Sequence, residues 1–298
     1  PDLGAPAFCR WHHRLACASA PVLKATKAAV NGARARQDSR SLLLSLPPCE
    51  ACLAGKMQKK ESPSQGNFAP ISNFPSAKNS LPRPAPVNSL VCLDPGINSS
   101  RPCRHGSARF ALLADLSAEV LYAKRLPSKG AAVSAFLGYC QRRGVMEALT
   151  MDNAKEFLQG DAAKETSARS VKVMPAPPRS PNKAPAERYM RTIAEGARSM
   201  LYLAGMDPRL FWSDAAECRA EMHNFMAPPA HPLAPLERAA GNRPSIAHWR
   251  IFGCEAMSYI EKDKRYKYNA KMQRTINLGP SPARARSACK LLCLRSKQ

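Results

Sequence analysis

Short apolar runs and longer periodic stretches alternate between residues 89 and 225. Five runs have the composition of strands, and they predict strands at residues 89–94, 109–115, 119–126, 145–152 and 170–174. Apolar residues at helical spacing predict three helices, at residues 129–143, about 182–204 and 211–225. Strands come first and helices are interleaved later, so the pattern indicates an α/β or α+β domain.

The segments on either side of this region have a different character. Residues 61–87 are rich in Pro, Ser, Asn and Lys without apolar periodicity, and we interpret them as a linker. Residues 246–278 indicate short strands with basic turns, whereas no period is visible beyond Gly279. We therefore expect an N-terminal region at 1–60, the linker at 61–87, a central domain at 88–227 and a basic, partly disordered region at 228–298.

The charge of the chain points to a polyanionic partner. Its 298 residues include 45 Lys and Arg against 22 Asp and Glu, which gives a formal net charge of +23 and a pI near 10.0. Such a balance favours nucleic acid or an anionic membrane surface as the partner. No apolar run reaches the roughly 18–20 residues that a membrane-spanning helix needs, so the sequence predicts no such helix.

Cysteine usage bears on the compartment. The chain has 11 Cys, an odd number, and most of them are scattered singly. This favours free thiols in a reducing, intracellular compartment. The chain starts at Pro1 without a signal-peptide pattern, and we expect it to be a piece of a longer polyprotein.

Potential metal ligands are dense near the N-terminus. Cys49 and Cys52 have CxxC spacing, and His12 and Cys17 lie upstream in a short segment rich in His and Cys. Zinc takes four tetrahedral N and S ligands, which two close pairs joined by a longer loop can supply. Our candidate site is His12, Cys17, Cys49 and Cys52, and four protein ligands make such a site structural. The alternative is that these thiols are unliganded and the histidines are exposed to solvent.

Three acidic residues stand at positions suited to a different metal. Asp94 ends the first predicted strand, Asp152 ends the fourth, and Glu187 lies near the start of the long helix. Mg²⁺ takes few carboxylates together with water and substrate phosphates, and two such ions support an in-line phosphoryl displacement. The alternative is that Asp94 starts a turn, Asp152 caps a helix, and Glu187 pairs with Arg191 on a solvated face.

Six segments, in order along the chain, resemble the integrase of copia-type long-terminal-repeat retrotransposons. Residues 151–157 (MDNAKEF) are similar to the SDNGGEF of that family, and residues 181–188 (PNKAPAER) to the end of its PQQNGVAER. The other similar segments are MRTIAEGARSML at 190–201, FWSDAA at 211–216, WRIFGC at 249–254 and the stretch 271–279. The resemblance runs from about Cys9 to Gly279, which is most of the chain.

The resemblance implies a fold, an activity and a set of site residues. The fold would be α/β, with an RNase H-like mixed five-stranded sheet and flanking helices after a small zinc-binding helical region and the Pro/Ser-rich linker. By motif match, Asp94, Asp152 and Glu187 would hold two Mg²⁺ or Mn²⁺ ions. Asp115 matches a family position that we take as structural, and it is the reserve candidate should Asp94 not serve.

The implied activity is 3′-end processing and DNA strand transfer, both metal-dependent phosphoryl transfers. The implied partners are the DNA ends of the element, target DNA and further copies of the chain, in the nucleus or in a cytoplasmic particle. Basic residues near the carboxylates are candidates for contacts with DNA phosphates, namely Lys155, Lys183, Arg188 and Arg191. Phosphate contacts carry little sequence information and make binding depend on salt.

The sequence departs from the family pattern beside both predicted metal sites. Cys17 stands where the zinc motif of the family has its second His, and Cys is a competent zinc ligand. Ala154 and Lys155 replace the two glycines that follow the second Asp, and glycine is the residue that permits positive φ. These departures indicate a diverged or decayed copy. Two alternatives therefore stay open, a non-catalytic nucleic-acid-binding remnant and a metal-dependent RNase H-like nuclease.

Overall fold

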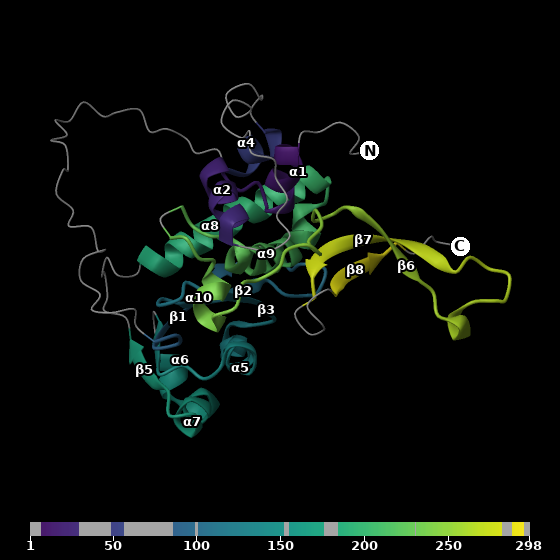
Figure 1. The fold of residues 1–298 in the computed structure, drawn as a ribbon. Helices are drawn as coiled ribbons and strands as arrows, with labels where there is room; N and C mark the ends of the chain where they lie inside the picture. Colours follow the sequence, from purple (N-terminus) through teal and green to yellow (C-terminus); the bar gives the residue numbers. More distant parts are fainter. Residues whose placement is uncertain are drawn as a thin grey trace, which may run out of the picture.

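A five-stranded mixed sheet lies at the centre of the computed structural model, which describes residues 7–29, 49–56, 86–98, 101–151, 155–175, 184–229, 231–281 and 288–294 (Figure 1). The strands are β1 (Leu90–Asn98), β2 (Arg109–Asp115), β3 (Leu121–Leu126), β4 (Ala148–Met151) and β5 (Lys172–Pro175). Their order is β3-β2-β1-β4-β5, with β1, β2 and β3 antiparallel and with β4 and β5 parallel to β1. This is the RNase H-like arrangement, so the predicted fold class is confirmed.

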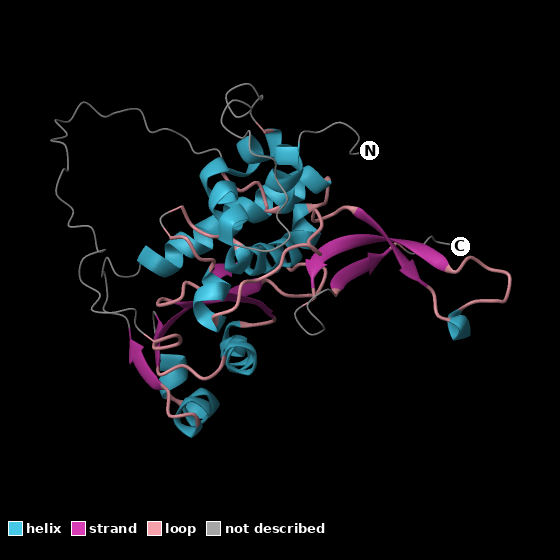
Figure 2. Ribbon diagram, in the orientation of Figure 1, coloured by secondary structure: helices cyan, strands magenta, loops and turns pink. Residues whose placement is uncertain are grey.

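Each face of the sheet buries its own hydrophobic core, because alternate residues of a strand point to opposite faces. Val91, Leu93 and Leu113 pack on one face with Phe136 of α5 (Ala132–Arg143). Leu112 and its alternate neighbours pack on the other face against α8 (Ala184–Ala204) and α9 (Pro208–Phe225). Figure 2 shows the helices on both sides of the strands. Two shorter helices, α6 (Lys155–Leu158) and α7 (Gly160–Ala168), link β4 to β5.

The N-terminal helices pack on α8. Helices α1 (Ala7–Arg14) and α2 (Ala20–Ala29) precede α4 (Glu50–Lys56), and α4 lies directly against α8. At the contact, a Cβ on Gly55 would lie 2.2 Å from Ser199 Oγ and 2.6 Å from the Ser199 backbone nitrogen. Only glycine allows this approach, and Arg198 Nε donates a hydrogen bond of 3.1 Å to the Gly55 carbonyl.

A second sheet follows α10 (Pro235–Ala240) and has the order β6-β7-β8. Its strands are β6 (Glu255–Tyr259), β7 (Met272–Pro280) and β8 (Cys289–Cys293). The strands expected between residues 246 and 278 are therefore present. The sequence shows no period beyond Gly279, yet residues 289–293 form β8, which pairs with β7 at Thr275↔Cys293 and Ile276↔Leu292. A five-residue strand has too few positions to show a period, and its order depends on a partner elsewhere in the chain. Residues 61–85 of the expected linker lie outside the described part.

Helix α9 carries two basic side chains into the core. The Nε2 atom of His223 is buried and, among the described residues, has no hydrogen-bond partner, while its ring centre lies 5.5 Å from that of Tyr189. Arg219 is buried beside Gly196, and two of its guanidinium nitrogens also have no partner in the part of the chain that the structure describes. Burial lowers the pKa of His223 to about 3 and that of Arg219 to about 10. None of the described helices combines the length and apolar character that would let it cross a membrane.

We expect His223 to make the fold sensitive to mild acid. An unfolded histidine gains its proton near pH 6.5, whereas burial keeps folded His223 neutral down to about pH 3. Between these values the unfolded chain binds one more proton, so the free energy of unfolding falls as the pH is lowered. This one group removes about 2 kcal/mol at pH 5.

Urea unfolding at pH 7 and at pH 5 measures this effect in the wild type and in His223→Phe, which keeps a ring against Tyr189. The variant should lose about 2 kcal/mol less stability between the two pH values. His231→Gln, in a loop after α9, is the control and should behave like the wild type. Equal losses in His223→Phe and in the wild type would contradict the prediction.

Candidate functional site

The four predicted zinc ligands come together in the structure. One ligand atom from each of His12, Cys17, Cys49 and Cys52 lies within 4.8 Å of all the others. His12 Nε2 is 3.3 Å from Cys52 Sγ. His12 is near the end of α1, and Cys17 follows in the turn after it. Cys49 directly precedes α4, and Cys52 lies in the first turn of α4. Among the described residues, these four are the group of His, Cys, Asp or Glu side chains placed closely enough to hold a metal ion.

The environment of His12 suits a metal ligand. Its Nδ1 lies 2.8 Å from the carbonyl oxygen of Ala18 and donates its proton there. The Nε2 lone pair is thereby left for a metal, which is the arrangement that ligating histidines usually have. Burial lowers the pKa of His12 and so favours the neutral ring that ligation requires.

A tight turn directs the Cys17 thiol into this cluster. Ala16 and Cys17 have φ angles of 52° and 56°, in the left-handed region that residues other than glycine seldom adopt. The turn is held by the Cys17 amide, which donates a hydrogen bond of 2.8 Å to the His12 carbonyl, and by Lys56 Nζ, which donates to the Cys17 carbonyl. Burial, with the nearby Cys52 and Cys49 thiols, raises the pKa of Cys17. A divalent cation would offset this, since coordinated thiols lose their protons.

Asp94 lies on the face of the sheet that α8 covers. In β1 it pairs with Leu112 of β2, and directly paired residues point to the same face. Leu112 packs in the core with Ile193 of α8, so the half-buried Asp94 faces the same side. The pairing of β1 with β2 shifts between Asp94 and Ile97, where a β-bulge occurs. Bulges often re-aim side chains beside functional sites.

Of the other two predicted carboxylates, the structure describes Glu187 but not Asp152. Glu187 is exposed in the first turn of α8, and α8 packs on β1 and β2. Strand β4 ends at Met151, which pairs with Leu93, the residue before Asp94. Asp152 is the next residue along the chain and lies outside the described residues. The structure therefore places Asp94 and Glu187 on one side of the sheet.

Asp115, the reserve candidate, has a structural role. It is fully buried, and it pairs with Val91, whose side chain is in the core of the α5 face. Its carboxylate accepts hydrogen bonds from the Asn88 amide at 3.1 Å and the Ser117 amide at 2.9 Å. These bonds hold the start of β1 and the turn after β2, and they use the oxygens that a metal would need.

Two of the four basic candidates are described with their side chains. Arg188 and Arg191 are exposed on α8 beside Glu187, and among the described residues no ion pair joins Glu187 to Arg191. Lys155 is the first residue of α6, but its side chain lies outside the described part, as does all of Lys183. The two arginines can therefore reach a phosphate in solvent, and the contact itself stays a prediction.

Sequence reasoning missed a buried charge cluster around Asp214 of α9, whose side chain is only 1% exposed. The Asp214 carboxylate accepts hydrogen bonds from Arg104 Nε at 2.8 Å, from Arg125 at 3.3 Å and from His105 Nε2 at 3.3 Å. Burial alone would raise the pKa of Asp214, but the Arg104 guanidinium and its other partners outweigh burial and lower it. The cluster joins the loop before β2, strand β3 and α9.

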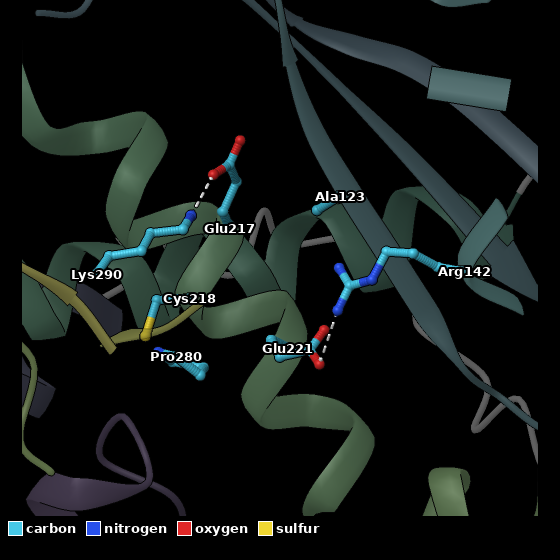
Figure 3. Close-up of a pocket in the computed structure, with 7 residues that line it drawn as sticks. All are labelled: Ala123, Arg142, Glu217, Cys218, Glu221, Pro280 and Lys290. Carbon is cyan, nitrogen blue, oxygen red and sulfur yellow. Dashed lines mark hydrogen bonds and ion pairs between the residues drawn. The ribbon is translucent and has the colours of Figure 1, made fainter. Parts of the chain in front are cut away.

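A small pocket near this cluster has its charges already paired (Figure 3). It is lined from α5, α9, β3, β7 and β8. Glu217 of α9 accepts from Lys290 of β8 at 2.9 Å, and Glu221 pairs with Arg142 of α5 at 3.4 Å. These carboxylates are committed to ion pairs between elements, so we assign the pocket a role in packing.

Comparison with known proteins supports the resemblance noted from the motifs. No protein-family model matches the chain. The retrovirus-related Pol polyprotein from transposon TNT 1-94 of Nicotiana tabacum is 26% identical over 241 residues. The match covers 78% of this chain, while the chain spans only 17% of the length of that relative.

Two solved structures to which this chain is similar are integrase catalytic cores. The HTLV-2 core in complex with magnesium is 16% identical, with a TM-score of 0.39, and the match covers 48% of this chain and 88% of that chain. The BIV core is 14% identical, with a TM-score of 0.42, and the match covers 52% of this chain and 95% of that chain. The sequence match shows that this chain is similar to part of a retrovirus-related Pol polyprotein, and that match covers most of the chain.

Proposed function

We propose that this chain is an integrase segment that catalyses metal-dependent 3′-end processing and DNA strand transfer. The observation that carries the proposal is the placement of Asp94 and Glu187 on the same side of an RNase H-like sheet. The register of β4 supports the proposal. Met151, the last residue of β4, pairs with Leu93 of β1, and the residue that follows each of them along the chain is a predicted carboxylate, Asp152 after Met151 and Asp94 after Leu93. Asp152 would complete the set of three carboxylates.

The donor set fits the metal that this chemistry uses. Carboxylate oxygens are hard ligands, and Mg²⁺ or Mn²⁺ binds a few of them while keeping positions for substrate phosphates. When bound, two such ions activate the attacking oxygen and stabilise the leaving one. Asp94 occupies a half-buried position in β1 beside a β-bulge, and Glu187 lies in the first turn of the long helix α8. Both positions hold a side chain on a rigid element, as precise alignment of a phosphodiester requires.

The basic residues of α8 would hold the substrate. Arg188 and Arg191 are exposed next to Glu187, and a charge-assisted contact from either would draw a DNA phosphate toward the carboxylates. The net charge of +23 supports the same partner. We further infer that the chain acts as a homo-multimer in the nucleus or in a cytoplasmic particle. Sedimentation of the full chain with and without DNA tests the multimer.

The His/Cys cluster would hold a structural Zn²⁺. One imidazole and three thiols within 4.8 Å of one another match the donor types and the number that tetrahedral zinc takes. All four positions are filled by protein, so the site has no open position for a substrate. Its function would be to hold α1 and α4 together on α8.

A strand-transfer assay with blunt DNA ends and Mg²⁺ or Mn²⁺ tests the proposal. The wild-type chain should join ends to target DNA, and Asp94→Asn, Asp152→Asn and Glu187→Gln should each reduce joining by about 100-fold or more. Asp161→Asn is the matched control, because this carboxylate is exposed on α7 and pairs only with Lys164 among the described residues. It should join like the wild type.

The other outcomes separate the alternatives. Hydrolysis without joining would identify a metal-dependent nuclease, and DNA binding with neither reaction would identify a non-catalytic remnant. One observation favours the remnant. His223 Nε2 and two guanidinium nitrogens of Arg219 are buried without a hydrogen-bond partner among the described residues, and such unsatisfied groups are rare in native folds.

A further inference from the structure

The ribbon of β6 and β7 belongs to the second sheet and presents aromatic and basic side chains. In Figure 1 this ribbon extends away from the helices, and the short helix η4 (Lys262–Lys264) lies at its far end. The Ile260 amide donates a hydrogen bond of 2.8 Å to the Lys271 carbonyl and closes the loop at its base. We call residues 261–270 the tip loop.

Two tyrosines of the tip loop stand almost wholly in solvent. Tyr266 is 82% exposed and Tyr268 is 92% exposed. The Asn269 amide donates to the Tyr266 carbonyl at 3.1 Å, so both rings belong to one tight turn. Between them, Lys267 places its Nζ 5.7 Å from the centre of the Tyr268 ring. Rings this exposed add little to packing, which leaves their faces accessible to a ligand.

The apolar surface continues from the tip loop along one face of the ribbon. Tyr259 pairs with Met272 across the strands, and Met257 pairs with Arg274, so these four side chains share a face. Tyr259, Met272 and Met257 are 62%, 54% and 52% exposed. The guanidinium of Arg265 lies 5.8 Å from the centre of the Tyr259 ring and donates to its hydroxyl at 3.4 Å. We call this the ribbon face.

Positive charge surrounds these rings. Between Glu255 and Arg274 the basic residues are Lys262, Lys264, Arg265, Lys267, Lys271 and Arg274, against three acidic residues. Two of the acids are used locally, since Glu261 pairs with Lys264 at 2.9 Å and Glu255 with Arg274 at 3.0 Å. Lys262, Lys267 and Lys271 make no ion pair within the described part of the chain. Their charges are therefore available to an anion.

Exposed aromatic rings alternating with uncommitted lysines fit one class of ligand best. Single-stranded nucleic acids are bound by aromatic side chains that stack on bases, while basic side chains follow the phosphates. Protein interfaces, in contrast, are depleted in lysine at their centre. A base inside a duplex is stacked on both faces and offers none to a tyrosine. The surface chemistry thus favours unpaired nucleotides over duplex DNA and over a protein partner.

We propose that the tip loop and the ribbon face bind unpaired nucleotides of a single-stranded nucleic acid. Bases stack on Tyr266 and Tyr268, and phosphates contact Lys262, Lys267 and Lys271. The site uses none of the three carboxylates and needs no Mg²⁺, so it goes beyond the proposed integrase activity. It gives the C-terminal sheet a function in holding frayed or single-stranded ends.

Fluorescence anisotropy with the full chain tests this inference, using oligo-dT and oligo-rU of about 20 nucleotides and a duplex of equal length, without added Mg²⁺. Tyr266→Ala and Tyr268→Ala should each weaken binding of the single strands by about 5- to 100-fold, with an unchanged dependence on salt. Tyr268→Phe keeps the ring and should bind like the wild type. Lys267→Gln should lower the slope of log affinity against log salt by about 0.7.

Controls keep the inference falsifiable. Tyr202→Ala removes another exposed tyrosine, on α8, and should leave binding unchanged. The binding measurement contains no Mg²⁺ and the strand-transfer assay reads joining, so a failure of the integrase proposal is distinguishable from a failure here. Equal preference for dT and rU supports recognition by stacking. If Tyr266→Ala and Tyr268→Ala bind single strands like the wild type, or lose duplex affinity by the same factor, the inference is overturned.

Discussion

The Cys52→Ser variant is expected to lose its bound zinc together with the order of the N-terminal helices. Cys52 Sγ lies 3.3 Å from His12 Nε2, inside the four-ligand cluster, and a hydroxyl is a poor substitute for a thiolate. Structural zinc sites contribute about 10–16 kcal/mol of binding free energy in small domains. That is as large as the whole stability of a typical domain, about 5–15 kcal/mol. Without the metal, short helices such as α1 and α4 cannot hold their places.

Two measurements check this expectation. Elemental analysis should find one zinc per wild-type chain and much less in Cys52→Ser, and amide hydrogen exchange should show α4 losing its protection. Cys140→Ser is the matched control, because Cys140 lies on α5 in the core of the other sheet face. A Cys52→Ser protein with full zinc content or with unchanged exchange in α4 would show that the cluster is not a zinc site.

Asp214→Asn is expected to destabilise the central fold by about 3–5 kcal/mol. The substitution keeps the shape of the side chain but removes the negative charge that faces Arg104 and Arg125, whose side chains are only 27% and 28% exposed. Breaking a buried ion pair costs more than the pair itself contributes, since the remaining charges stay desolvated without a partner. The cluster connects three separate elements, so the whole unfolding transition should shift.

Urea unfolding at pH 7 measures the effect, with Asp161→Asn on the surface of α7 as the control that should change little. The pH dependence gives a second signature. Because the pKa of Asp214 is lowered in the fold, its contribution is present above about pH 4 and is lost as the pH falls below that value. The loss caused by His223 begins near pH 6.5, so the two groups separate on the pH axis. A loss below 1 kcal/mol at pH 7 would mean that solvent reaches the cluster.

The sequence was sufficient where the signal is local. Strand β2 has the predicted bounds of 109–115, and the predicted helix at 129–143 is present as a short 3-10 turn followed by α5. Helix α9 begins at Pro208, three residues before its predicted start, because Asp207 caps it through the Arg209 amide and proline suits the first turn. The convergence of His12, Cys17, Cys49 and Cys52 was predictable from their close pairs and from the donor types that zinc prefers, and their binding of zinc stays a prediction.

Features that depend on distant partners were not predictable in this way. Strand β8 is ordered because it pairs with β7, and its five residues alone do not indicate that partner. Asp214 reads as an ordinary helical acid until β3 and the loop before β2 bring arginines to it. Arg219 and His223 are polar residues on the buried face of α9. The pattern of apolar residues along a helix assigns polar residues to the surface, so it does not predict their burial. The position of Asp152 relative to Asp94 and Glu187 remains a prediction.

The contact of Gly55 with α8 also fixes the order in which the chain can mature on the ribosome. The Gly55 carbonyl accepts its hydrogen bond from Arg198, a residue 143 positions later in the chain. The N-terminal helices are thus synthesised long before the surface on which they dock, and they must wait while more than a hundred residues emerge. Nascent chains that stop short of α8 expose the small face of Gly55 to water and to chaperones. The contact between Gly55 and α8 therefore forms only after α8 has been synthesised.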